Sequence, residues 1–347
     1  MSAADSAANG ANLENPAALE SPDMGTSGLA GRATLDIAIV RALSTRSDER
    51  GLLRFAGHLG VMALTGSLVW FTLTRGWWWL LLPALVVHGF TIVTMFAPMH
   101  ECVHRTAFAS PKLNEIFGWL AGLLGFYNFH YYRYYHTWHH RYTQDAARDP
   151  ELMTPKPRNR LEYWQEISGW NFWSRRPLIY TKLALGKMDA YPFIPANGRA
   201  KVQKSTAAQF AVYIVAIGLC FAGYPYAWWL WFLPAIVAQP LLRAILIVEH
   251  TGCTTDENGL TNTRTTFASP PVRFLMWNMS FHAEHHLYPS ISFHQLPQAH
   301  RELQAKITHI SPSYAASNRS VLAAIDGGYV TGTSPLQLTQ QASGERG

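Results

Sequence analysis

The sequence predicts an all-α integral membrane protein, with four transmembrane helices in two hairpins and a helical cytoplasmic cap that holds a histidine-rich metal site. Three observations predict this fold. Only 14% of the 347 residues are charged and 48% are hydrophobic, whereas charged residues usually make up about 25%. Four long apolar stretches occur in two closely spaced pairs. Finally, many of the 15 histidines fall in regularly spaced clusters.

The four apolar stretches are long enough to cross a bilayer, which takes about 20 mostly apolar residues per helix. They are residues 56–74, 77–98, 207–223 and 226–248. The first two are joined at Arg75 and Gly76 and the last two at Tyr224 and Pro225, so each pair is expected to form a hairpin. The alternative is four buried helices of a soluble protein. That alternative is disfavoured because a chain of this length can hardly bury four such stretches.

Tryptophans and basic residues predict how these helices lie in the membrane. Indole rings prefer the membrane–water interface, and tryptophans cluster at 77–79 and 228–231, where the second and fourth stretches open. The segment 99–206 contains 15 Lys and Arg residues, whereas the links within the pairs contain only Arg75. By the positive-inside rule, both termini and this segment face the cytoplasm. The net charge of +6 therefore favours anionic headgroups or an acidic protein partner over nucleic acid.

The remaining parts of the chain define three regions. Residues 1–33 are rich in Ala, Ser, Asn and Gly and contain few large apolar residues, so they are expected to form a disordered tail. They are not expected to be a signal peptide, because no basic stretch leads into an apolar core. Residues 34–309 are expected to form the membrane domain, beginning with a short amphipathic helix at 35–43 on the membrane surface. Residues 310–347 are expected to be a polar tail. Residues 113–129 are apolar but short, so they cross, lie in the interface or re-enter.

Three histidine clusters have the spacing of metal ligands on a helix. Their motifs are HECVH, HTWHH and HAEHH, and a lone histidine, His250, follows the fourth apolar stretch. Positions i, i+3 and i+4 share one helix face, so each cluster directs its imidazoles toward one point. Neutral imidazole binds Zn, Cu, Fe and Ni, and scattered histidines would not repeat this spacing. The clustered candidates are His100, His104, His136, His139, His140, His282, His285 and His286.

The predicted topology restricts residues 113–129 further. HECVH follows the first hairpin, and His250 and HAEHH follow the second, so all of them lie on the cytoplasmic side. If residues 113–129 crossed fully, HTWHH would emerge on the opposite side. A shared metal site therefore requires this segment to be re-entrant or interfacial.

The motifs HECVHR, HTWHHRYTQD and NMSFHAEHHLYP resemble the three histidine boxes of the membrane-bound fatty acid desaturase family, which has related hydroxylases and ketolases. The resemblance covers roughly residues 55–300. It implies a non-haem di-iron centre that activates O2 and removes hydrogen from an unactivated C–H bond. It implies the eight clustered histidines as ligands, His250 as a ninth, and no catalytic residue besides the ligands. Some members carry an asparagine four residues before the ninth histidine, where this chain has Leu246.

Polar residues close to the boxes are candidates for orienting the ligands. A ligating imidazole usually donates its other N–H group to a carboxylate or a carbonyl. The candidates are Glu101, Asp145, Asp149, Glu249, Asn278 and Glu284. Each has an alternative role, as a surface or salt-bridging residue or, for Asn278, as a helix cap.

The sequence predicts the reaction class and its partners as follows. Oxidation of an unactivated C–H bond needs a redox metal, and zinc does not change oxidation state. No GxGxxG or CxxCH motif occurs, and three dispersed cysteines cannot hold an iron–sulfur cluster. Electrons are therefore expected from a separate ferredoxin- or rubredoxin-type donor with its reductase. The substrate is expected to be apolar and delivered from the membrane, as an acyl chain carried by a lipid, by coenzyme A or by an acyl-carrier protein.

Two alternatives remain at this stage. The same site can serve a hydroxylase or ketolase that acts on a carotenoid, an alkane or another lipid. The second alternative is a non-redox membrane zinc protein. Nine candidate histidines argue against it, because one zinc ion takes four protein ligands, or fewer when it also binds water.

Overall fold

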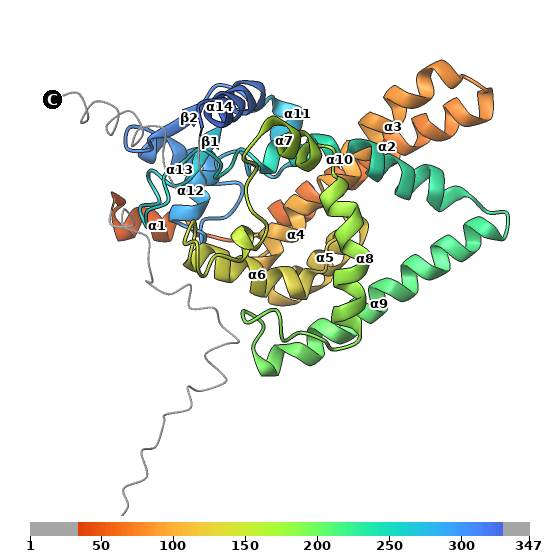
Figure 1. Ribbon diagram of the computed structural model, residues 1–347, viewed down its shortest axis with the longest axis horizontal. Coiled ribbons are helices and arrows are strands. Elements are labelled where there is room, and N and C mark those ends of the chain that lie inside the picture. Colours follow the sequence, from red (N-terminus) through yellow and green to blue (C-terminus); the bar gives the residue numbers. More distant parts are fainter. Residues whose placement is uncertain (1–33, 329–347) are drawn as a thin grey trace, which may run out of the picture.

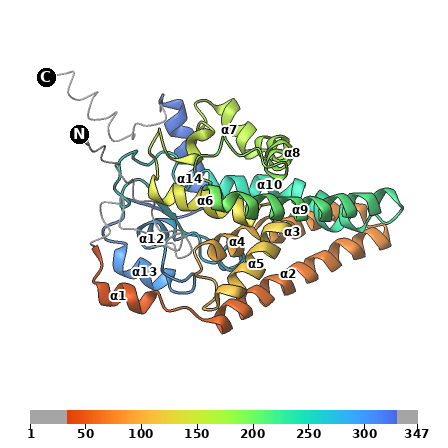
Figure 2. The ribbon, with the colours of Figure 1, turned by 90° about the horizontal axis from the view of Figure 1, so that it is seen from below.

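The computed structural model describes residues 34–328 and is mostly helical. Figures 1 and 2 show a helical cap at one end, from which long helices extend in one direction. Four helices of the described residues are long and apolar enough to span a membrane: Asp48–Arg75, Trp78–Val103, Ala196–Phe221 and Trp228–Leu246. They overlap the four predicted stretches, which confirms that part of the predicted fold.

The first two long helices form an antiparallel pair. Helix α2 (Asp48–Arg75) begins at Ser47, whose side chain accepts a hydrogen bond from the backbone of Arg50. It ends at Gly76, whose positive φ of 67° suits a residue without a Cβ. Helix α3 (Trp78–Val93) returns along α2 and continues into α4 (Phe96–Val103), which carries the first histidine cluster toward the cap.

The last two long helices diverge after their connecting turn. Helix α9 (Ala196–Phe221) packs on α8, whereas η4 (Trp228–Phe232) and α10 (Leu233–Leu246) run back along α3 (Figure 1). The contact between α3 and α10 is close because α3 presents Gly89 to α10. A Cβ atom at Gly89 would lie 1.9 Å from the carbonyl oxygen of Pro234. Small residues at such crossings let helix backbones approach each other.

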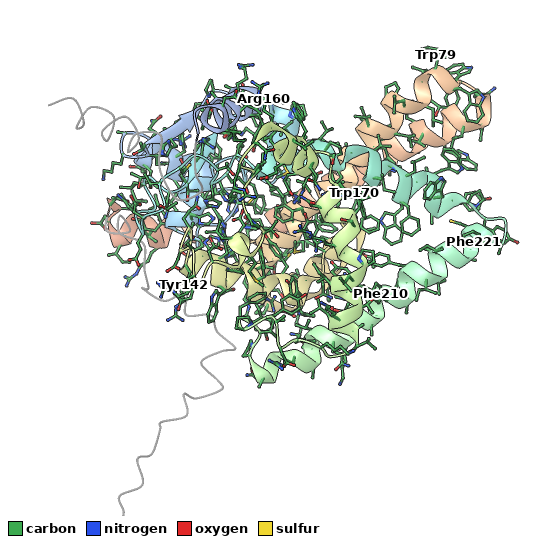
Figure 3. The ribbon with its side chains drawn as sticks, viewed as in Figure 1. Trp79, Tyr142, Arg160, Trp170, Phe210 and Phe221 are labelled. Atoms are coloured by element: carbon green, nitrogen blue, oxygen red, sulfur yellow. The ribbon has the colours of Figure 1, made fainter. Side chains whose placement is uncertain are left out.

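The far ends of the long helices expose apolar side chains. Only 17% of the apolar window of α2 and 22% of that of α9 are buried within the protein. Trp79 and Phe221 are 76% and 90% exposed, and Figure 3 shows both far from Tyr142 and Arg160 of the cap. Apolar surfaces of this extent are covered by lipid or by a partner, which supports a membrane protein.

The short apolar segment forms α5 (Pro111–Leu124), which has 14 residues. At 1.5 Å per residue such a helix is about 21 Å long, which is less than the roughly 30 Å of a bilayer core. Helix α5 packs against α4, and a turn at Phe126, with a φ of 63°, leads into α6 (Phe129–Arg141). This return brings the second histidine cluster next to the first.

The cap consists of short elements around these helix ends. They are α1 (Ile37–Leu43), η3 (Pro150–Met153), α7 (Arg160–Ile167), α8 (Trp170–Ala184), α11 (Pro270–Leu275), α12 (His282–Leu287), α13 (Leu296–Leu303), α14 (Tyr314–Asp326) and two strands, β1 (Arg264–Thr266) and β2 (His309–Ser311). The strands pair in parallel, with Arg264 opposite His309. The helix expected at 35–43 is present as α1.

Part of the predicted polar tail is helical. Residues 314–326 form α14, which buries Ser317, Val321 and Ile325. The apolar residues of this segment are few but lie on one face, which suffices for packing. The tail predicted at 1–33 and residues 329–347 lie outside the described part of the chain.

Candidate metal centre

The histidines of the site come from three helices and one loop. Helix α4 ends at the first cluster, α6 carries the second, and α12 carries the third. His250 follows α10 and faces the same space. All nine are at most 5% exposed. The structure therefore brings together every histidine that the sequence singled out as a ligand.

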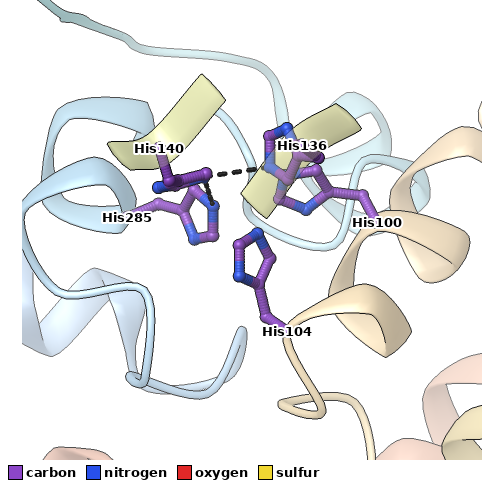
Figure 4. Close-up of side chains that lie close together, drawn as sticks. All are labelled: His100, His104, His136, His140 and His285. Atoms are coloured by element: carbon purple, nitrogen blue, oxygen red, sulfur yellow. Dashed lines mark hydrogen bonds between the residues drawn. The ribbon is translucent and has the colours of Figure 1, made fainter. Parts of the chain in front are cut away.

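Five of these histidines form one group, which we call site A (Figure 4). Its members are His100, His104, His136, His140 and His285, each with a ring nitrogen within 4.8 Å of the others. The Nε2 atom of His140 lies 2.9 Å from Nε2 of His136 and 3.1 Å from Nε2 of His285. The ring nitrogens thus converge from α4, α6 and α12 on one volume.

The other four form a second group, site B. His139, His250 and His286 have ring nitrogens within 4.8 Å of one another. Nε2 of His250 lies 3.2 Å from Nε2 of His139 and 3.2 Å from Nε2 of His282, which completes the group. The rings of His140 in site A and His286 in site B stack at 4.0 Å, so the two sites are direct neighbours.

The electrostatics of both sites suit a cation. Burial, and then the neighbouring imidazoles, hold the pKa values of His136, His140 and His286 well below the usual range. Burial lowers the pKa of His250 and of His285 to about 3. These rings are therefore neutral at pH 7 and offer a lone pair.

Several buried ring nitrogens have no hydrogen-bond partner among the described residues. In site A these include both nitrogens of His100 and Nε2 of His104, and in site B they include Nε2 of His286. An unpaired buried polar atom is costly, and a bound metal ion removes that cost. Nine converging imidazoles with such orphaned nitrogens fit two metal ions.

Asp149 holds the ring of His139 in place. The Nδ1–H group of His139 donates to Oδ1 of Asp149 at 2.9 Å. This contact leaves Nε2 of His139 to face site B. The pKa of His139 differs from those of the other histidines of the two sites. Burial alone would lower it, but the carboxylates of Asp149 and Glu151 raise it above its usual value. The Nδ1 atom of His250 donates likewise to the carbonyl oxygen of Asn262 at 3.2 Å.

Two other predicted carboxylates lie beside the ligands without hydrogen-bonding to them. Oε1 of Glu101 is 3.8 Å from Nδ1 of His100, and its Oε2 accepts from Thr106. Oε2 of Glu249 is 3.6 Å from Nε2 of His282. Burial, and then the negative charge of Glu151, raises the pKa of Glu249 well above its usual value.

The remaining three candidates bond elsewhere. Asp145 pairs with Arg148 in a surface turn, and the side chain of Asn278 donates to the carbonyl oxygen of Phe293. Glu284 bonds to His300 and Thr265. Because Glu284 is two residues from His282, it lies on nearly the opposite face of α12. Proximity in sequence therefore misassigned these side chains.

Sequence reasoning missed three side chains that contact the ligands. Oε2 of Glu151 is 3.3 Å from Nε2 of His139. The hydroxyl of Tyr132 is 3.3 Å from Nδ1 of His136, and that of Thr143 is 3.3 Å from Nδ1 of His286. Tyr132 precedes His136 by one helical turn, which is a signal that could have found it. Glu151 carries no periodic signal, since it lies beyond the end of α6.

A cavity of about 440 Å³ adjoins both sites. Its lining includes histidines of both sites and the aromatic residues Phe96, Tyr127, Tyr132, Tyr135 and Phe172. Charged residues also line it, among them Lys156, Glu166, Arg175, Arg176 and Arg243. The guanidinium of Arg176 lies over the ring of Phe172 at 4.2 Å. The arrangement suits a molecule with an apolar chain and a polar end.

The chain is similar to proteins of known activity. Residues 76–318, which include all nine histidines, match the family model described as fatty acid desaturase. Over 229 residues the chain is 25% identical to the sn-1 oleoyl-lipid 12-desaturase of Picosynechococcus sp.. That match covers 63% of this chain and 62% of the relative, so the chain spans less than two thirds of the relative's length.

Proposed function

Because the chain belongs to the fatty acid desaturase family, we propose that it is an O2-dependent di-iron oxidoreductase that desaturates a fatty acyl chain of a membrane lipid. One observation carries this proposal beyond family membership. Two adjacent groups of buried imidazoles, sites A and B, line one cavity together with several aromatic side chains. Such a site places an apolar chain next to two metal positions.

The donor set supports two iron ions. Site A offers five imidazoles and site B offers four. A single zinc ion takes four protein ligands, or fewer when it also binds water. Iron held there would supply the O2-dependent oxidation of an unactivated C–H bond. The role of the protein is to hold most of the imidazoles neutral, to orient them through residues such as Asp149, and to keep bulk water away.

The cavity walls support an acyl substrate. The ring of Phe96 lies 5.8 Å from that of His100, and the ring of Tyr132 stacks on His136 at 5.0 Å. A methylene group packed against these aromatic rings would lie close to site A. The polar end of the lipid would lie near Arg175 and Arg176. The desaturase activity named for the relative favours loss of two hydrogens over hydroxylation.

The same proposal assigns the orientation and the electron source. Both termini, the cap and the metal centre face the cytoplasm, in keeping with the positive-inside rule. Electrons come from a separate ferredoxin- or rubredoxin-type protein and its reductase. The excess of Lys and Arg in residues 99–206 supports an acidic donor that docks on the cap.

Lipid profiling tests the reaction. The full chain is expressed in a host with and without the substitution His139→Ala, and the cellular lipids are compared by mass spectrometry. Loss of two hydrogens from an acyl chain is expected only with the unchanged protein. Gain of one oxygen instead would assign hydroxylation.

Metal analysis of the purified protein tests the centre itself. About two iron ions per chain are expected for this donor set. One zinc ion and no iron in active protein would contradict the proposal. His309→Gln, a histidine substitution in β2 away from both sites, is the matched control and should retain the iron.

A further inference from the structure

The two sites differ in the number of imidazoles that they offer. Five histidine nitrogens converge on site A, whereas site B has His139, His250, His282 and His286 only. Site B therefore has one imidazole donor fewer than site A. Leu246, which lies four residues before His250 and lines the same cavity, has no donor atom.

The carboxylate of Glu151 lies next to site B. Nδ1 of His139 is engaged by Asp149, so Nε2 is the nitrogen that faces site B. Oε2 of Glu151 lies 3.3 Å from that same Nε2, which in turn lies 3.2 Å from Nε2 of His250. The carboxylate oxygen therefore approaches the space on which two site B imidazoles converge. Glu151 also lines the cavity together with His139, His250 and His282.

Local structure aims this side chain at the site. Asp149 caps the short helix η3 and accepts a hydrogen bond from the backbone N–H of Glu151 at 2.9 Å, through the same Oδ1 atom that holds His139. Lys156 donates to Oε1 of Glu151 at 2.7 Å. One carboxylate oxygen is thus held by an ammonium group, and the other is left toward the metal position.

We propose that Glu151 is the fifth protein ligand of site B, where its Oε2 atom joins the four imidazoles and makes the two metal positions chemically unequal. This inference rests on the di-iron function proposed above. A carboxylate beside imidazoles is a common ligand set for non-haem iron. Glu249 is the competing carboxylate, since its Oε2 is 3.6 Å from His282.

The test uses the full-length protein loaded with ⁵⁷Fe(II) and measures iron content and Mössbauer spectra. The unchanged protein should bind about two iron ions per chain and show two doublets of equal area. Glu151→Gln should change or remove one doublet, leave the other unaltered, and weaken iron binding at that position by at least about tenfold. Asp145→Asn, a nearby carboxylate on the surface, is the control and should leave both doublets unaltered.

Three outcomes would overturn the assignment. Unaltered doublets in Glu151→Gln would show that this carboxylate is not a ligand. The same change of one doublet in Lys156→Gln, a variant that keeps the carboxylate of Glu151, would assign the effect to the Lys156–Glu151 ion pair. A change in Glu249→Gln alone would assign the ligand to Glu249. Failure of the unchanged protein to bind two iron ions would instead contradict the proposed function, so the two failures are distinguishable.

Discussion

Substitution of Gly89 by alanine should separate the two helices that lead to the metal centre. A Cβ at this position would lie 1.9 Å from the carbonyl oxygen of Pro234 and 2.7 Å from the Cβ of Ala238. Real Cβ contacts essentially never fall below 3.0 Å, so α3 and α10 must move apart by at least about 1.1 Å, the difference between 3.0 and 1.9 Å. The contact is with backbone, which cannot rotate away.

The size of the effect follows from this geometry. Overpacking of this kind usually costs about 1–3 kcal/mol, which corresponds to a fall of about 2–10 °C in the midpoint of thermal unfolding. Function should suffer as well, because α3 continues into α4, which carries His100, and α10 ends four residues before His250. Separation of these helices moves a ligand of site A relative to a ligand of site B. Iron content should therefore fall together with stability.

This prediction is tested by measuring the midpoint of thermal unfolding and the iron content of the protein in detergent. Gly60→Ala on α2 is the matched control, since no atom lies within 4 Å of a Cβ built there. It should leave both quantities unchanged or raise stability slightly. An unfolding midpoint and an iron content of Gly89→Ala equal to those of the unchanged protein would refute the reasoning about the α3–α10 contact.

Three further predictions concern the site. His139→Ala should abolish iron retention at site B and turnover while the protein remains inserted, and full activity would contradict a shared centre. Asp149→Asn should weaken iron binding by about 10- to 100-fold, measured by chelator competition, because the ring of His139 loses its anionic partner. Arg175→Gln should raise KM with little change in kcat if the arginine meets the polar end of the lipid. The exposed Arg160→Gln serves as its control, and equal KM values would refute this role.

The local features of this protein were predictable from its sequence. Apolar runs and terminal tryptophans identified the four long helices, because hydropathy depends on composition within a short window. Histidine spacing identified eight of the histidines, because the helical period alone decides which side chains share a face, and the family resemblance added His250. The prediction was weakest at boundaries, and α14 was missed because its few apolar residues are dispersed among small polar ones.

Side chains that act across elements were not predictable in the same way. Asp145 and Glu284 are close to the boxes in sequence yet bond to Arg148 and His300, whereas Glu151 has no motif and reaches His139. A short distance in sequence does not show where a side chain points, because neighbouring residues can lie in a turn or on different faces of a helix. Only the packed chain decides such contacts.

The sequence by itself determined that this protein has four membrane-length helices and three sets of histidines able to bind metal. The tertiary structure decided how those histidines divide. A set at i, i+3 and i+4 spans an arc of the helix, so His140 faces site A while His139, from the same motif, faces site B. That division depends on where α4, α12 and the segment after α10 lie around α6. The helical period fixes which ligands share a face, and only packing decides which metal position each ligand meets.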